Sequence, residues 1–155
     1  MKGMFVGVVG RRSWGKAHTL KALTDGNSLF RYLRIKGQQF MLQRWTDDDM
    51  PGSYEDFVNQ LHPENSPRVI AAICPQMFGE DRSEQLVRLL TTLKRKYELY
   101  FFILRNKGND PRRTMSEREI HPFEEHGKAV QVYRLAGATP EQRSWALERF
   151  VGQQL

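Results

Sequence analysis

The chain has 155 residues, 39% of them hydrophobic, which is the size of one domain built around a single core, so residues 1–155 are expected to fold together. The formal net charge of +6 would suit nucleic acid, but lysine and arginine are spread along the chain, so nucleic acid is not expected as the main ligand. A lone cysteine, Cys74, excludes a disulfide framework, and no run approaches the ~18 apolar residues of a membrane span. A cytoplasmic protein without a membrane span is therefore expected.

Apolar periodicity predicts strands in alternation with helices and shows no internal repeat. Residues 4–9 predict a strand, and residues 16–24 follow as a short helix. Two β-rich segments, 29–35 and 38–45, are separated only by residues 36–37. Because two residues cannot contain a crossover helix, these strands are expected to form an antiparallel hairpin.

After the hairpin the alternation returns. Ser53 is expected to cap a helix whose apolar stripe extends to Leu61, and Pro63 to end it. Further along the chain the pattern predicts strands at 68–74, 97–104 and 129–135 and helices at 80–96 and 116–125.

The last helix has the clearest start signal. Thr139 is expected as its capping residue, with Pro140 at the first helical position and Gln142 three residues after the cap. Its predicted core face consists of Trp145, Ala146, Leu147, Phe150 and Val151.

These elements predict an α/β fold with three layers, in which a six-stranded, mostly parallel sheet with one antiparallel edge hairpin lies between helices. The ligand crevice of such a sheet lies outside the carboxyl ends of its strands. The loop that follows the first strand is expected to lie in this crevice.

That loop has the pattern of a phosphate-binding loop, between a strand and a helix as the motif requires. Its glycines allow close approach, its backbone amides can bind phosphate oxygens, and its lysine adds a positive charge. The position after the lysine normally carries a Ser or Thr that ligates Mg²⁺, and alanine has no oxygen to offer, so bound Mg²⁺ is doubtful. The alternative is a glycine-rich turn with a solvated lysine. The predicted phosphate-binding residues are Gly10, Arg11, Arg12, Ser13, Trp14, Gly15, Lys16 and Ala17.

The order of strand, phosphate loop, helix, hairpin and alternating elements resembles the small Ras-like GTPase domain over nearly the whole chain. Residues 49–52 are similar to the family's Asp-x-x-Gly, and residues 106–110 to its guanine-reading Asn-Lys-x-Asp. Residues 135–138 loosely resemble the loop that backs the base. The resemblance implies GTP or GDP as ligand, with Asp49 on the metal side, Gly52 on the γ-phosphate side, and Asn106, Lys107 and Asp110 on the base side.

Several positions depart from the family pattern. Asn109 stands where the base-reading carboxylate is expected, with Asp110 one residue late, and residues 25–28 are too few for the usual first switch. Ser53 follows Gly52 where a water-positioning Gln is common. We therefore expect a nucleotide-binding protein with weak or absent hydrolysis that acts as an interaction module for a protein partner, and no catalytic residue is assigned. The alternatives are an active small GTPase with an atypical metal shell and a pseudo-GTPase scaffold that binds no nucleotide.

Overall fold

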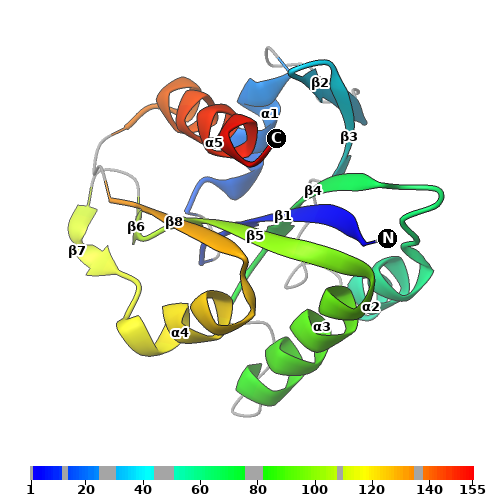
Figure 1. The fold of residues 1–155 in the computed structure, drawn as a ribbon. Coiled ribbons are helices and arrows are strands. Elements are labelled where there is room, and N and C mark those ends of the chain that lie inside the picture. Colours follow the sequence, from blue (N-terminus) through cyan, green and yellow to red (C-terminus); the bar gives the residue numbers. More distant parts are fainter. Residues whose placement is uncertain are drawn as a thin grey trace.

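The computed structural model describes residues 2–11, 14–24, 31–43, 51–75, 82–107, 110–134 and 138–155. In these ranges a central sheet lies between two layers of helices (Figure 1). The strands are β1 (Gly3–Val9), β2 (Tyr32–Ile35), β3 (Gln38–Gln43), β4 (Arg68–Ile73), β5 (Tyr97–Leu104), β6 (Asn106–Lys107), β7 (Asp110–Thr114) and β8 (Ala129–Tyr133). The helices are α1 (Lys16–Leu23), α2 (Pro51–Gln60), α3 (Arg82–Lys96), α4 (Glu117–His126) and α5 (Pro140–Gln154).

The sheet has six strands in the order β2-β3-β4-β1-β5-β8. The strand pairs β3–β4, β4–β1, β1–β5 and β5–β8 are parallel, and only the β2–β3 pair is antiparallel. This confirms the predicted α/β class and the mostly parallel sheet with an antiparallel edge. Strands β1 and β5 lie inside the sheet, which is why their sequences are nearly continuous apolar runs.

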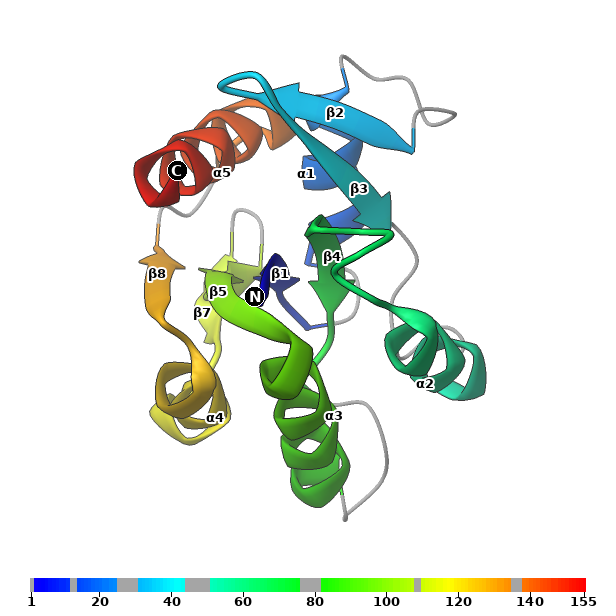
Figure 2. The same cartoon turned by 45° about the vertical axis from the view of Figure 1, so that its right-hand side comes forward.

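The predicted β2–β3 hairpin is confirmed by its two-residue turn. Lys36 and Gly37 have φ angles of 50° and 76°, and positive φ at both positions matches the twist of the strands that such a turn joins. The Nζ atom of Lys36 donates to the carbonyl oxygen of Gly152 at 2.9 Å. The hairpin therefore lies against the end of α5 (Figure 2).

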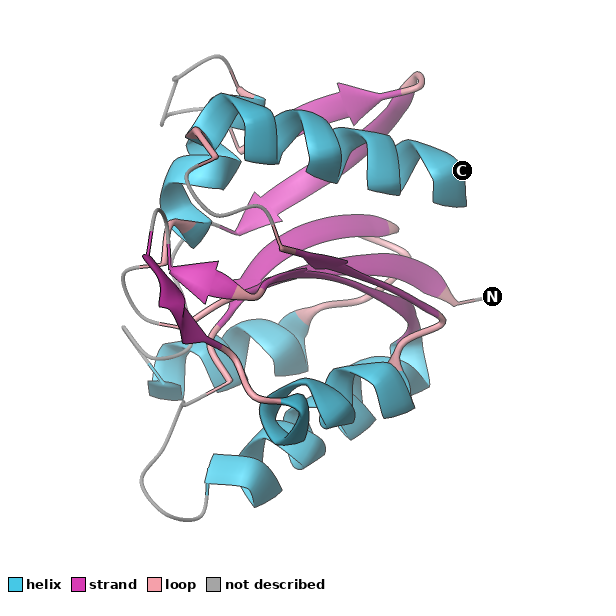
Figure 3. Ribbon diagram, turned by 90° about the vertical axis from the view of Figure 1, so that its left-hand side faces the viewer, coloured by secondary structure: helices cyan, strands magenta, loops and turns pink. Residues whose placement is uncertain are grey.

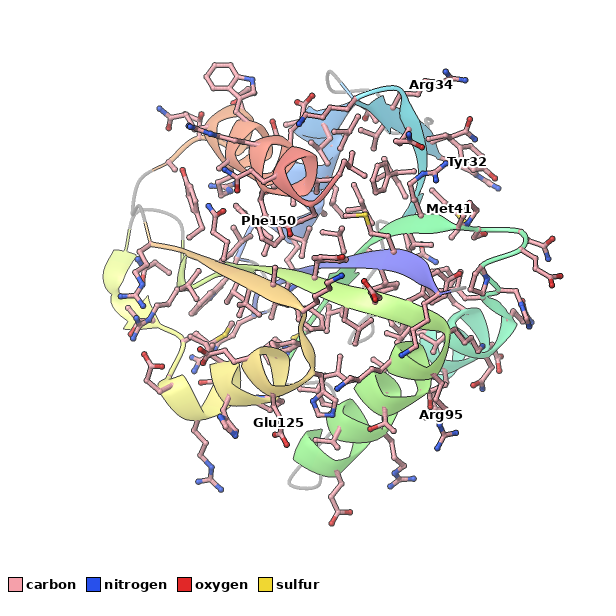
Figure 4. The ribbon with its side chains drawn as sticks, in the orientation of Figure 1. Tyr32, Arg34, Met41, Arg95, Glu125 and Phe150 are labelled. Carbon is pink, nitrogen blue, oxygen red and sulfur yellow. The ribbon has the colours of Figure 1, made fainter. Side chains whose placement is uncertain are left out.

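The two faces of the sheet bury separate apolar clusters. Val6 and Val8 of β1 face α1 and α5, whereas Phe5 and Val9 face α2, α3 and α4. This alternation follows from the two-residue period of a strand. Seen along the sheet edge, the three layers are distinct (Figure 3). Phe150 lies between α5 and the sheet, while Arg34 and Arg95 project from the surface (Figure 4).

Both helices on the C-terminal side of β5 begin with a capping box. Thr139 and Gln142 cap α5 as predicted, with Pro140 in its first turn. Ser116 and Glu119 cap α4, which confirms the short helix expected near residue 116. In each box, the side chain of the cap accepts from a first-turn amide that would otherwise lack a partner.

Two expectations about local structure were wrong. Helix α2 begins at Pro51 instead of after Ser53, because proline is well suited to the first helical position. Trp145 is 68% exposed, since it lies about 140° around the helix axis from Phe150, outside the buried stripe. The polar segment after β5 contains the short β6–β7 ladder, which its sequence pattern did not indicate.

Among the described residues, none of the helices is both long enough and apolar enough to cross a bilayer.

Candidate functional site

The loop between β1 and α1 begins at the centre of the sheet. The amide of Gly10 donates to the carbonyl of Ile73 at 3.1 Å, which joins the start of the loop to the end of the neighbouring strand β4. Gly15 caps α1 in the left-handed conformation, with φ of 93°, which a side chain would make costly. The predicted strand, loop and helix arrangement is thus present. Arg12 and Ser13 lie outside the described residues.

Lys16 is buried within this loop, with 4% of its surface exposed. Its Nζ atom donates to the carbonyl oxygens of Gly10 at 2.5 Å and Arg11 at 2.9 Å. The ammonium group therefore lies across the loop, and the alternative of a solvated lysine is wrong for this side chain.

The first turn of α1 differs from those of α4 and α5. Its cap, Gly15, offers no side-chain acceptor to the first-turn amides, and the turn contains no acidic residue. Such amides suit an anion, which the positive end of the helix dipole also favours. Ala17 is exposed in this turn, and its methyl group does not fit the role of a metal ligand.

The side chain of Arg11, in the same loop, is bound to helix α4. Its guanidinium forms a two-point ion pair with Glu119 of α4, in which Nε donates to Oε2 at 2.9 Å and Nη2 pairs with Oε1. The same guanidinium lies 5.1 Å from the ring centroid of Trp14, which is buried in the core between the sheet and α2–α4. Arg11 and Trp14 thus anchor the loop to the body of the protein.

This ion pair shifts the pKa values of both side chains in the direction that favours their charged forms. The hydrogen bond with Glu119 raises the pKa of Arg11. Burial alone would raise the pKa of Glu119, but hydrogen bonds from Arg11 and Ser116 outweigh burial and lower it. A carboxyl group with a lowered folded-state pKa stabilises the protein above its unfolded-state pKa, and this contribution is lost as pH falls through the folded-state value.

We therefore expect Glu119→Gln to reduce the pH dependence of stability. Between about pH 6 and pH 3, the wild type should lose about 1–2 kcal/mol more free energy of unfolding than the variant. Urea unfolding at a series of pH values measures this difference. Glu124→Gln, an exposed position of the same helix, is the control and should follow the wild type. Parallel pH profiles for wild type and Glu119→Gln would contradict the role of the pair.

The base-side candidates lie around β6 and the end of β8. Asn106 donates from Nδ2 to the carbonyl oxygen of Arg134 at 2.8 Å, so the residue stands beside the start of the β8–α5 connection. Its Oδ1 atom is the buried side-chain polar atom that lacks a hydrogen-bond partner among the described residues. Lys107 pairs with Asp110 across the β6–β7 ladder, where the register shifts between Asn106 and Lys107. The structure describes only the backbone of Lys107 and Asp110.

The two metal-side candidates come after β3 in the chain. Asp49 lies outside the described residues, and Gly52 is in the first turn of α2. Both follow β3, and β4 separates β3 from β1. Because β4 lies between them, the ends of β3 and β1 are separated by two strand spacings, about 10 Å. In the ranges that the structure describes, no group of three His, Cys, Asp or Glu residues could hold a metal ion.

Besides Glu119, Arg143 of α5 contacts the loop, and neither residue was predicted from the sequence. Arg143 is 9% exposed, and its guanidinium lies against Gly15. Position 143 is four residues before Leu147 and seven before Phe150, both core residues of α5. This helical spacing is the signal that could have revealed a buried arginine.

Comparisons with known proteins support only the architecture. No family model matches the chain, and no curated protein matches it. The structure is similar to a solution NMR structure described as a de novo designed P-loop fold protein, with a TM-score of 0.53 and 12% sequence identity. The match covers 99% of this chain and 97% of that one. At this identity the likeness shows the fold alone, and it is consistent with a P-loop-like architecture.

Proposed function

We propose that this protein binds a nucleotide through its phosphates at residues 10–17, with GTP or GDP favoured, and that it hydrolyses the nucleotide weakly or not at all. It would then act as an interaction module for a protein partner, in the manner of a divergent member of the small Ras-like GTPases. Trp145, exposed on α5, is a side chain of the type enriched at protein interfaces.

The observation that carries the proposal is the geometry of the loop. It joins the carboxyl end of β1 to the first turn of α1, turns through left-handed Gly15, and holds the buried ammonium of Lys16 over its carbonyls. A phosphate group here would accept hydrogen bonds from the first-turn amides and give Lys16 a negatively charged acceptor.

The preference for guanine is supported by the surroundings of Asn106. Its Oδ1 atom is buried without a hydrogen-bond partner in the described part of the chain, so it could accept from a base N–H group. The hydrogen bond to Arg134 places Asn106 beside the residue that precedes the 135–138 segment in the chain.

Weak hydrolysis is proposed because groups that would hold Mg²⁺ and the attacking water do not fit. Ala17 offers no oxygen to a metal ion, and Ser53 follows Gly52 where a water-positioning Gln is common in the family. Phosphoryl transfer depends on positioning and charge stabilisation, which these departures weaken.

A titration with fluorescent GTP, GDP and ATP, with and without Mg²⁺, tests the proposal. Guanine nucleotides should bind more tightly than ATP, and Mg²⁺ should change their affinity little. Lys16→Met keeps most of the buried stem but removes the charge, and should weaken binding by about 1.5–3 kcal/mol, or about 10- to 100-fold.

Lys21→Met is the matched control, since Lys21 is exposed on the same helix, and it should bind as the wild type does. Absence of binding for all three nucleotides would overturn the proposal in favour of a scaffold without nucleotide. Mg²⁺-dependent multiple turnover would instead support an active GTPase.

A further inference from the structure

Arg143 is a buried cation at an unusual place in the fold. It lies near the start of α5, is 9% exposed, and packs where α5 meets α1 and the loop after β1. Arginine is rarely buried to this extent unless it is paired, because removing a charge from water is costly. Burial also lowers the pKa of the Arg143 guanidinium, which is the direction expected for a desolvated cation.

Two nitrogens of the guanidinium have neutral acceptors. Nε donates to Oγ1 of Thr19 at 2.9 Å, and Nη1 donates to the carbonyl oxygen of Ala138 at 2.7 Å. The Thr19 hydroxyl in turn donates to the carbonyl oxygen of Gly15 at 2.7 Å. Arg143 therefore joins the loop after β1 to the end of the connection between β8 and α5.

The third nitrogen, Nη2, has no hydrogen-bond partner among the described residues, and Arg143 forms no ion pair with a carboxylate there. Nη2 is also the atom nearest to the open side of Gly15, where an ideal Cβ would lie 2.8 Å away. Nη2 thus lies beside the loop with two donors, and Glu141 of the same helix acts on the Arg143 charge through space without an ion pair among the described residues.

Arg11 provides the contrast within the same loop. Its Nε and Nη2 atoms are both engaged by the carboxylate of Glu119, so its charge is already neutralised. Of these two arginines, Arg143 has the unfilled donors, and it forms no ion pair with a carboxylate among the described residues. A planar guanidinium is well matched to phosphate oxygens.

We propose that Arg143 is a phosphate-binding residue of this site, whose Nη2 donates to a phosphate oxygen of a nucleoside diphosphate or triphosphate held at residues 10–16. The assignment rests on the proposed nucleotide-binding function. The other two guanidinium nitrogens hold Thr19 and Ala138, so the bound phosphate would be linked to the loop on the base side.

Calorimetric titration with GDP and with inorganic pyrophosphate tests the assignment, using Arg143→Lys and Arg143→Gln. Pyrophosphate has no base, so it reports the phosphate contact alone. Arg143→Gln should weaken both ligands by about 10- to 100-fold, and Arg143→Lys by less, because lysine keeps the charge. Arg149→Gln, an exposed arginine of the same helix, is the matched control and should bind as the wild type does.

Which of the two variants binds the ligands more tightly distinguishes a phosphate contact from a purely structural role of Arg143. If Arg143 only held Thr19 and Ala138, glutamine should serve at least as well as lysine, and that result would overturn the assignment. Unchanged GDP affinity in both variants would also overturn it. If Arg143→Gln does not fold, as judged by circular dichroism, Arg143→Lys should still bind pyrophosphate several-fold more weakly than the wild type, and equal affinity would overturn the assignment.

The two proposals can fail separately. A wild-type protein that binds GDP while its Arg143 variants bind equally well retains the proposed function and loses only the role of Arg143. A wild-type protein that binds neither GDP nor pyrophosphate overturns both.

Discussion

Trp14→Ala is expected to lower the free energy of unfolding by about 3–5 kcal/mol, because it would leave a large cavity in the core. The indole is 6% exposed and belongs to the apolar cluster between the sheet and helices α2–α4. Its ring also contacts the guanidinium of Arg11, so the loop after β1 would lose an anchor. Urea unfolding followed by circular dichroism measures the change.

Trp145→Ala provides a matched control, since the same side chain is removed from a surface that is 68% exposed. It should change the free energy of unfolding by less than about 1 kcal/mol. Similar losses for the two variants would mean that Trp14 is not the core anchor of the loop.

Gly15→Ala is expected to destabilise the protein by about 2–5 kcal/mol. Its left-handed backbone, with φ of 93°, is costly for alanine by about 1–2 kcal/mol. The new methyl group would also meet Nη2 of Arg143 at 2.8 Å, and such overlap adds about 1–3 kcal/mol. Thermal and urea unfolding of the variant measure the sum.

Gly37→Ala is the control that measures the cost of a left-handed backbone for alanine without any overlap of the new methyl group. Gly37 has a similar φ of 76°, but a methyl group there would meet nothing within 4 Å. It should therefore cost only about 1–2 kcal/mol.

A double variant tests the overlap itself. In Gly15→Ala combined with Arg143→Ala, the overlap is absent, so the losses in free energy of unfolding of the two single variants should sum to more than the loss of the double variant. Strict additivity would contradict the close contact between Gly15 and Arg143.

The elements that the sequence predicted well are those encoded by local pattern. The apolar runs of β1, β4 and β5, the two-residue turn at 36–37 and the capping box at Thr139 each depend on residues close together in the chain. Strand period, turn chemistry and helix capping are short-range properties, so they can be recognised without a structure. The strand, loop and helix arrangement around residues 10–16 is of the same kind.

The order of the strands in the sheet was not predicted from the sequence. The insertion of β4 between β3 and β1 depends on which strands pair, and the apolar runs of β1 and β4 do not say which strands lie beside them. The β6–β7 ladder joins polar residues without alternation, so periodicity did not indicate it. Pairing energy comes from contacts between strands, and a single-strand pattern does not contain that information.

The sequence by itself determined that the chain has alternating strands and helices, a buried central strand and a loop with the glycines and lysine of a phosphate cradle. Only the tertiary structure decided which charges meet at that loop. Arg11 pairs with Glu119 across 108 residues of chain, and Arg143 bonds to Thr19 across 124. Such pairs form because packing of α4 and α5 against the sheet brings them together, and no local pattern in the chain specifies that packing.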